Sequence, residues 1–179
     1  MIHTILLSLA IIIATVLFIA KMMKKEYIIS SEIIVNMPND IVFNFVKHLR
    51  NQERYSKWVM TDPNIKLDYK GNDGTVGFVA AWTSEIKDVG VGNQKITNIF
   101  DNYRYDVIIH FEKPFKGVST AFTTTQAISE NQTNVCTTFN TSTPFPMNIM
   151  IPMIKKMLKK DMDLNMQTLK RVLENDKQF

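Results

Sequence analysis

The sequence predicts an α+β protein with one N-terminal transmembrane helix ahead of a single soluble domain. Residues 2–20 are almost continuously apolar, which is typical of a membrane-spanning segment. Residues 64–142 read as strands separated by turn signals, and residues 147–175 place apolar side chains at helical spacing without any glycine. We therefore divide the 179-residue chain into an anchor with its basic flank, residues 1–25, and one domain, residues 26–179, which is long enough for a sizeable core.

The apolar segment from Ile2 to Ala20 predicts a helix that crosses the membrane. Nineteen helical residues reach about 28 Å, which is roughly the thickness of the hydrocarbon core of a bilayer. A cleaved signal peptide would need a basic start and a small-residue cleavage site, but no lysine or arginine precedes the segment and Phe18 spoils the site before Ala20. No cysteine ends the segment for lipid attachment, and an all-round apolar terminal helix rarely finds enough protein to bury it. We expect a single-pass anchor.

Charges beside the apolar segment predict which side of the membrane holds the domain. Lys21, Lys24 and Lys25 follow the segment, whereas only His3 and the α-amino group lie at its start. The positive-inside rule then places the domain on the cytoplasmic side of the cell membrane. The rest of the chain is nearly neutral, with 18 basic against 17 acidic residues, which argues against a nucleic-acid binder.

The domain begins with a strand followed by two short helical pieces. Tyr27 to Asn36 is rich in β-branched residues and predicts the strand. Pro38 ends this strand, and Asn39 or Asp40 is expected to cap the first helix. Apolar side chains at helical spacing continue that helix to Leu49, and residues 54–59 form a shorter helical or looped piece.

About six antiparallel strands follow, and one long helix ends the chain. Turn signals at residues 71–74 and 101–102 separate the strands. The alternation is clearest from Tyr103 to Phe111, where the odd-numbered residues share one face. Pro152 marks either the start of the terminal helix or a kink in it. One side of this helix is expected to be lined by Met153, Met157, Leu164, Leu169, Val172 and Leu173.

Several short motifs occur along the domain in a characteristic order. They are Met37-Pro38-Asn39-Asp40-Ile41-Val42-Phe43, Tyr55-Ser56-Lys57-Trp58, Tyr69-Lys70-Gly71, Trp82-Thr83-Ser84 and the pair Leu169-Lys170 with Leu173-Glu174. In this order they resemble the START-like superfamily, also called SRPBCC, of polyketide cyclase, lipid-transfer and pollen-allergen-type proteins, and most of all its membrane-anchored bacterial branch. The resemblance covers residues 27–175 and implies a helix-grip fold, in which an antiparallel sheet curls around a long C-terminal helix and leaves a cavity.

A cavity of this kind would bind a lipid or another hydrophobic small molecule. Aromatic walls with flexible methionines suit an apolar ligand of irregular shape, although the same side chains can simply fill a core. The candidate lining residues are Trp82, Tyr103, Tyr105, Val107, Phe122, Phe139, Met150 and Met157.

No catalytic or metal-binding pattern is recognisable in the sequence. The three histidines, His3, His48 and His110, lack metal-site spacing, and the single cysteine, Cys136, forms neither an intramolecular disulfide nor a cysteine-rich zinc site. No nucleophile elbow, phosphate loop or dinucleotide fingerprint is present, so no cofactor is expected. Cyclases of the superfamily use polar pocket residues as acid–base groups, and Tyr103, Arg104 and Tyr105 are the candidates for that role.

Three functions are compatible with the sequence, and oligomeric state is left open. The preferred hypothesis is a binding domain for a hydrophobic molecule. The enzyme alternative is cyclase or dehydratase chemistry, which a convergent ionisable pair in the cavity would favour. The third is an interaction module that regulates a partner, which a cavity filled by side chains would favour. The superfamily hosts all three, so its fold does not decide between them.

A basic stripe on the terminal helix suggests contact with the membrane surface. Lys155, Lys156, Lys159 and Lys160 recur at spacings that share one helix face. A solvated face partly balanced by Asp161 and Asp163 is the simpler interpretation. The alternative is that the stripe, with Lys21, Lys24 and Lys25, faces the anionic inner leaflet.

Overall fold

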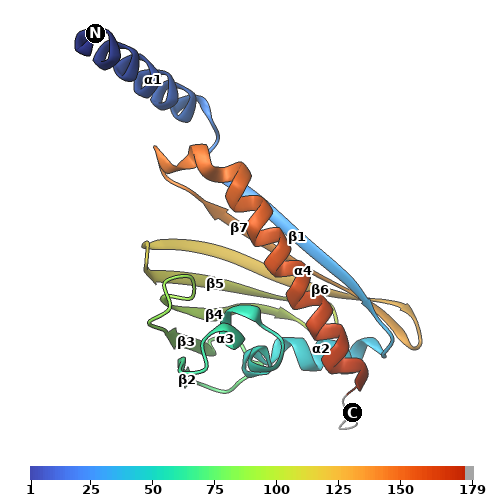
Figure 1. Cartoon of the computed structure of the whole chain (residues 1–179). Helices are drawn as coiled ribbons and strands as arrows, with labels where there is room; N and C mark the ends of the chain where they lie inside the picture. Colours follow the sequence, from blue (N-terminus) through green and yellow to red (C-terminus); the bar gives the residue numbers. More distant parts are fainter. Residues whose placement is uncertain (176–179) are drawn as a thin grey trace.

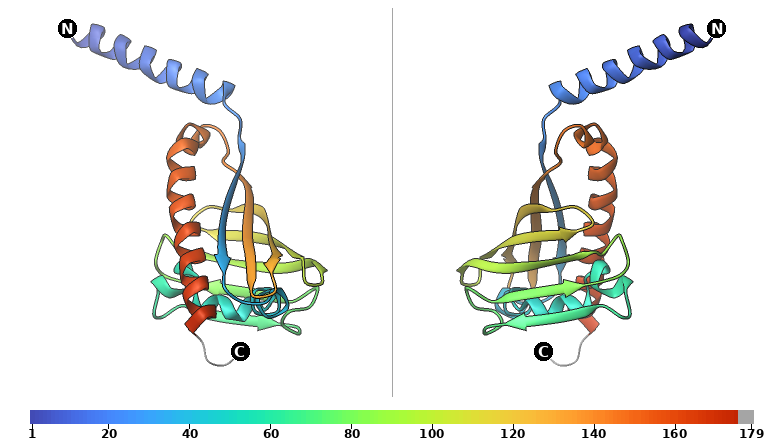
Figure 2. Two further views of the ribbon diagram at one scale, coloured as in Figure 1. Left: turned by 90° about the vertical axis from the view of Figure 1, so that its right-hand side faces the viewer. Right: turned by 90° about the vertical axis from the view of Figure 1, so that its left-hand side faces the viewer.

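The computed structural model describes residues 1–175 and shows a seven-stranded antiparallel sheet curved around a long C-terminal helix (Figures 1 and 2). The strand order across the sheet is β1-β7-β6-β5-β4-β3-β2. The helical elements are α1 (Ile2–Met22), α2 (Asn39–Lys47), the 3-10 helix η1 (Leu49–Arg54), α3 (Lys57–Thr61), the 3-10 helix η2 (Met147–Met150) and α4 (Ile151–Asn175). The strands are β1 (Glu26–Val35), β2 (Lys66–Lys70), β3 (Val79–Thr83), β4 (Val91–Phe100), β5 (Arg104–Lys113), β6 (Gly117–Ser129) and β7 (Gln132–Ser142). This is the predicted helix-grip α+β fold.

Helix α1 projects from one end of the domain, opposite the end where α4 finishes (Figure 2). It is long and apolar enough to cross a membrane. Of its side chains only Ala20 is buried, so the protein itself offers α1 almost no apolar cover. The helix extends two residues beyond the predicted end at Ala20.

Strand register gathers four segments at the end of the sheet from which α1 leaves. Glu26 pairs with Ser142, so the start of β1 lies beside the end of β7. Phe111 pairs with Gly117, which places the β5–β6 loop at the same end. Val91 pairs with Lys113, which adds the β3–β4 loop. We call this set of strand ends and loops the anchor edge.

The buried face of α4 differs from the face that the apolar pattern predicts. Leu169 and Leu173 are in the core, but Met153 and Leu164 are exposed, and Met162 and Met166 are buried instead. Met162 lies nine residues after Met153, which at about 100° per residue is the opposite side of the helix. The prediction failed because the buried face also carries polar residues, which an apolar-pattern search assigns to solvent.

The starts of α2 and α4 lie near the predicted positions, but α2 lacks the predicted side-chain cap. Helix α2 has Pro38 at its cap position and no side-chain cap bond, so the expected capping by Asn39 or Asp40 is wrong. The Nδ2 group of Asn39 instead donates to the backbone oxygen of Asn102 at 2.7 Å, in the β4–β5 turn. Helix α4 begins at Ile151, so Pro152 marks its start, where a missing N–H costs no helical hydrogen bond.

Candidate ligand cavity

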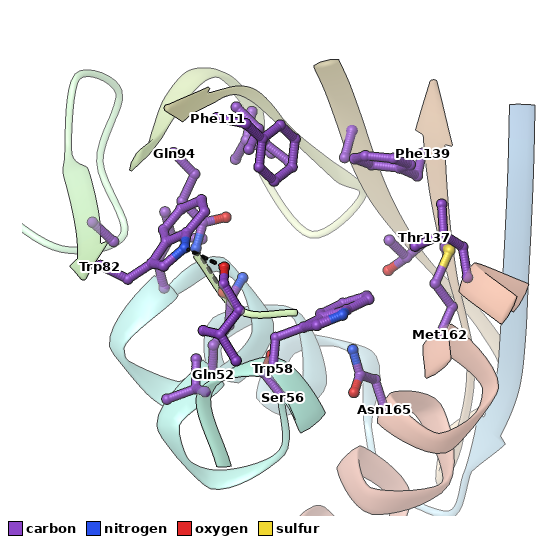
Figure 3. A pocket seen from close by; sticks show the side chains of 18 of the residues that line it. Gln52, Ser56, Trp58, Trp82, Gln94, Phe111, Thr137, Phe139, Met162 and Asn165 are labelled. Atoms are coloured by element: carbon purple, nitrogen blue, oxygen red, sulfur yellow. Dashed lines mark hydrogen bonds between the residues drawn. The ribbon is translucent and has the colours of Figure 1, made fainter. Parts of the chain in front are cut away.

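A cavity of about 540 Å³ lies between the inner face of the sheet, the helical segment η1–α3 and the middle of α4 (Figure 3). Its size is within the range of small-molecule sites in proteins. Most of its wall is apolar, and Phe111, Phe139 and Met162 face into it together with both tryptophans of the chain, Trp58 and Trp82. The side chains therefore leave a space between the packed core and the cavity wall that they do not fill.

The structure brings five of the eight predicted lining residues to the cavity. Trp82, Tyr105, Val107 and Phe139 line it from β3, β5 and β7. Phe122 borders it as well, but strand alternation turns its ring to the outer face of the sheet, where the Arg104 guanidinium lies 3.9 Å from the ring centroid.

The other three predicted residues do not line the cavity. Tyr103 is 55% exposed because it precedes β5 in a turn, before the alternation of that strand begins. Met150 belongs to η2, ahead of the part of α4 that reaches the cavity. Met157 is 58% exposed because it points away from the sheet, while the next residue, Leu158, lines the cavity.

The position of Trp82 depends on a glycine in the neighbouring strand. Trp82 pairs with Gly92, and a Cβ atom at Gly92 would lie 2.6 Å from the indole ring. The ring therefore lies directly over the β4 backbone, with its Nε1 donating to the backbone oxygen of Val89 at 3.2 Å and Phe111 meeting it edge-on at 6.0 Å. The sequence pattern does not predict this contact, since such a close approach brings together residues of two different strands.

A polar line of tyrosine and threonine hydroxyls crosses one wall. Tyr55 and Tyr105 are hydrogen-bonded to each other, Thr123 joins Tyr105, and the hydroxyls of Thr123 and Thr137 are 2.8 Å apart. Burial is the main cause that raises the pKa of Tyr55 and of Tyr105 above the ordinary tyrosine value. Both phenols therefore stay protonated and neutral near pH 7.

Exposed residues of two loops mark where the cavity opens. Besides Glu53 of η1, five residues both line the cavity and are exposed: Lys87 and Asp88 of the β3–β4 loop, Lys113 at the end of β5, and Pro114 and Phe115 of the β5–β6 loop. We call these five residues the rim. Both loops belong to the anchor edge, so these five residues lie along the same edge of the sheet as the start of β1, which follows α1.

Away from the rim, the charged side chain in the lining is Glu53, which bonds a tyrosine. The hydroxyl of Tyr69 donates to the carboxylate of Glu53, and the Arg50 guanidinium lies 4.3 Å from the Tyr69 ring centroid. Burial and the Glu53 hydrogen bond raise the pKa of Tyr69, so its phenol is a weak acid and is not a phenolate base at neutral pH. Within residues 1–175, no three histidine, cysteine or acidic side chains come together in a way that could hold a metal ion.

The predicted membrane-surface lysines are all exposed, on two elements. Lys21, Lys24 and Lys25 lie at the end of α1 and just after it. Lys155, Lys156, Lys159 and Lys160 lie in the first three turns of α4, near η2. Lys159 pairs with Asp163, and hydrogen bonds from Lys159 and Ser31 lower the pKa of that carboxyl group.

Together, the curled sheet, the long closing helix and the internal cavity define a helix-grip domain. Solved structures share this fold. Norcoclaurine synthase from Thalictrum flavum superimposes with a TM-score of 0.63 at 15% identity, covering 86% of this chain and 90% of that one. Ara h 8.0201 has a TM-score of 0.52 at 16% identity, with 80% and 98% covered. A protein from Thermus thermophilus has a TM-score of 0.60 at 12% identity, with 84% and 100% covered.

These likenesses confirm the START-like fold that the sequence motifs predicted. The identities are too low to carry over an activity or a ligand. No family model matches the chain, and no curated protein matches its sequence.

Proposed function

We propose that the protein is a membrane-anchored binding domain that holds a hydrophobic small molecule, such as a lipid, in its internal cavity. The observation that carries the proposal is the cavity of about 540 Å³ with a mainly apolar wall, open at the anchor edge. An empty apolar space of this size weakens the packing of a core, so its maintenance favours a role in binding. A pure interaction module would be expected to fill its cavity with side chains, whereas this domain keeps an open cavity.

The position of the opening supports exchange of the ligand with the bilayer. The rim lies on the edge of the sheet from which α1 leaves, so an α1 that spans the membrane would turn this edge of the domain toward the lipid surface. Phe115 of the rim is 71% exposed, and it lies between Lys113 at the end of β5 and Lys116. An aromatic side chain between lysines suits the interface between lipid headgroups and acyl chains.

The lysines of α4 extend this surface. Met153 and Met157 are exposed among Lys155, Lys156 and Lys160, which gives the first turns of α4 a basic and apolar face. These turns begin at η2, which contacts the end of α1. Such a face fits an anionic leaflet, and the positive-inside rule makes that leaflet the cytoplasmic one. Protection of the domain from protease in sealed, right-side-out vesicles would support this orientation, and its digestion there would contradict it.

Enzymatic cyclisation or dehydration is not part of the proposal. The lining brings together two ionisable pairs, Glu53 with Tyr69 and Tyr55 with Tyr105, and burial raises the pKa of all three phenols. A raised phenol pKa reduces the fraction available as a general base at neutral pH. The lining therefore favours a binding function over an acid–base reaction.

Blocking the cavity tests the proposal. Ala121 lines it from β6, and Ala121→Phe would place a ring in the space, whereas Thr120→Phe adds the same ring on the exposed outer face of that strand. The full chain in amphipol is extracted for co-purified molecules and titrated with a lipid panel, with Trp58 and Trp82 fluorescence as the readout. We expect binding by the wild type and by Thr120→Phe, and its loss in Ala121→Phe. A wild-type protein that retains nothing and binds none of the panel would overturn the proposal.

A further inference from the structure

Four uncharged side chains present polar atoms to the cavity without a protein partner. Nε2 of Gln94 donates to Oε1 of Gln52 at 2.6 Å, and no residue in the range 1–175 bonds the remaining amide N–H groups of Gln52 or the carbonyl oxygen of Gln94. Oδ1 of Asn165 accepts from the backbone N–H of Lys57 at 2.7 Å, which leaves its Nδ2 group unpaired within the same range. We call Gln52, Ser56, Gln94 and Asn165 the polar cluster; all four line the cavity (Figure 3).

Ser56 and Asn165 are more than nine-tenths buried. Ser56 is 6% exposed and Asn165 is 8% exposed, so both depend on the cavity for a hydrogen-bonding partner. Ser56 occupies the cap position of α3, where a serine hydroxyl normally accepts from the helix backbone, but it makes no such bond. Their free polar atoms are reached from the cavity, and an apolar occupant would cover them without a partner, which is unfavourable. This wall therefore suits an occupant that carries polar atoms of its own.

We infer that the polar cluster binds the polar end of an uncharged amphiphile, of the amide or alcohol class, while the apolar part lies against the aromatic wall. This inference rests on the proposed function. Three of the free groups, on Gln52, Ser56 and Asn165, are donors and suit a carbonyl or hydroxyl oxygen. The free oxygen of Gln94 is an acceptor and suits an N–H or O–H group of the same ligand. A primary amide offers both in one planar group.

Charges around the cavity disfavour an anionic end at the polar cluster. The four members are neutral, and the carboxylate of Glu53 is the charged group next to Gln52 in the lining. The lysines that line the cavity, Lys87 and Lys113, are on the exposed rim. A carboxylate at the polar cluster would lose its hydration without gaining a cation, which is costly in a mostly apolar cavity.

Three probes of similar length test the inference on the full chain in amphipol: oleamide, oleic acid and 1-octadecene. Both tryptophans line the cavity, so their fluorescence reports its occupation. We expect oleamide to bind at least tenfold more tightly than oleic acid or 1-octadecene. Equal affinity for oleamide and 1-octadecene would overturn the polar cluster as a binding site but leave the proposed function intact. Failure to bind any of the three would overturn both.

Two substitutions assign the effect to the cluster. Ser56→Ala removes only the free hydroxyl, and Asn165→Asp keeps the oxygen that accepts from Lys57 while it removes the N–H donor. We expect each to weaken oleamide binding five- to tenfold and to leave 1-octadecene binding unchanged. Asn140→Asp, on an exposed residue of β7, serves as the control. The unfolding temperature of Ser56→Ala should not fall, because its hydroxyl stabilises nothing in the ligand-free protein; unchanged oleamide affinity in both variants would refute the inference.

Discussion

Asn148 joins the apolar helix to the domain. Its side chain is fully buried, and its Nδ2 group donates to the backbone oxygen of Ala20 at 2.5 Å and to that of Met23 at 3.1 Å. These carbonyl groups lie at the C-terminal end of α1, where no helical N–H is available for them. The backbone N–H of Thr143 also donates to the oxygen of Lys25 at 2.8 Å. The domain is therefore held at a defined joint and is not merely tethered by a loose linker.

Replacement of this side chain should loosen the joint. Asn148→Ala removes both hydrogen bonds and leaves buried carbonyl groups unpaired, which costs about 1–3 kcal/mol. We expect faster trypsin cleavage after Lys24 and Lys25 in the full chain, measured by mass spectrometry of the fragments. Asn140→Ala, at an exposed position, should cleave at the wild-type rate. Equal rates for all three proteins would show that Asn148 does not hold the joint.

The buried tyrosines predict a loss of stability at alkaline pH. Tyr55 and Tyr105 have raised pKa values in the folded protein, whereas in the unfolded chain the pKa of each phenol is about 10. Their contribution to stability is thus complete below pH about 10 and is lost as the pH rises above that value, by up to about 1.4 kcal/mol per pH unit for each group. Tyr55→Phe should flatten the fall in unfolding temperature between pH 9 and 11. Tyr103→Phe, at an exposed position, should keep the wild-type slope.

Gly90 allows the two loops of the rim to pack directly against each other. Gly90 has a positive φ of 65°, and a Cβ atom there would lie 2.1 Å from the backbone oxygen of Lys113. The end of the β3–β4 loop therefore packs backbone to backbone against the end of β5. Trp82 donates a hydrogen bond to Val89 of the same loop, so a displacement of this loop would also displace the Trp82 ring in the cavity wall.

A methyl group at this contact should separate the loops. Gly90→Ala combines a left-handed backbone conformation, worth about 1–2 kcal/mol, with a clash against an unyielding backbone atom. We expect a lower unfolding temperature and faster ligand release, followed through Trp82 fluorescence. Gly117→Ala is the matched control, since a Cβ atom there meets no atom within 4 Å. Equal effects of the two substitutions would contradict this account.

At the scale of the whole molecule, the joint and the basic start of α4 lie together at the end of the protein that carries α1 (Figure 1), and the rim loops lie on the edge of the sheet that begins at this joint. This arrangement predicts that the rim touches the bilayer when α1 spans it. Phe115→Cys in a Cys136→Ser background allows attachment of a fluorescent dye at the rim. In nanodiscs, spin-labelled lipids should quench this dye strongly. A dye at Asn131→Cys, in the distant β6–β7 turn, should stay bright, and equal brightness at both positions would exclude rim contact.

The lysines of α4 predict a dependence on lipid charge. Replacing Lys155, Lys156 and Lys160 by glutamate should reduce quenching of the dye at position 115 in nanodiscs with anionic lipid, because repulsion tilts the domain away. Each lysine near an anionic surface is worth about 1 kcal/mol. Quenching in purely zwitterionic nanodiscs should change little, and Lys66→Glu on the exposed side of β2 serves as the control. An equal loss of quenching in anionic and zwitterionic nanodiscs would contradict a role of lipid charge and indicate that the substitutions alter the structure.

Features that depend on neighbours along the chain could be predicted from the sequence. The apolar helix follows from hydropathy alone, and the alternation from Tyr105 to Phe111 correctly gave the inner face of β5. The motif order gave the fold, because turns, proline breaks and strand patterns are local signals. The prediction for Tyr103 was wrong because this residue lies in the turn after Asn102, one residue before β5 begins, where the alternation of the strand does not yet apply.

Features that join distant segments were decided by the tertiary structure alone. Asn148 meets Ala20 across 128 positions of sequence, and Asn165 meets Lys57 across 108, so no local pattern marks either contact. The buried face of α4 includes Asn165 because the cavity beside it accepts a polar group, whereas Met157 points outward although it is apolar. The sequence by itself determined an apolar N-terminal helix followed by a helix-grip domain, through local hydropathy and periodicity. Only packing of the sheet against α4 decided where the cavity lies, which polar atoms face it and which loops form its rim.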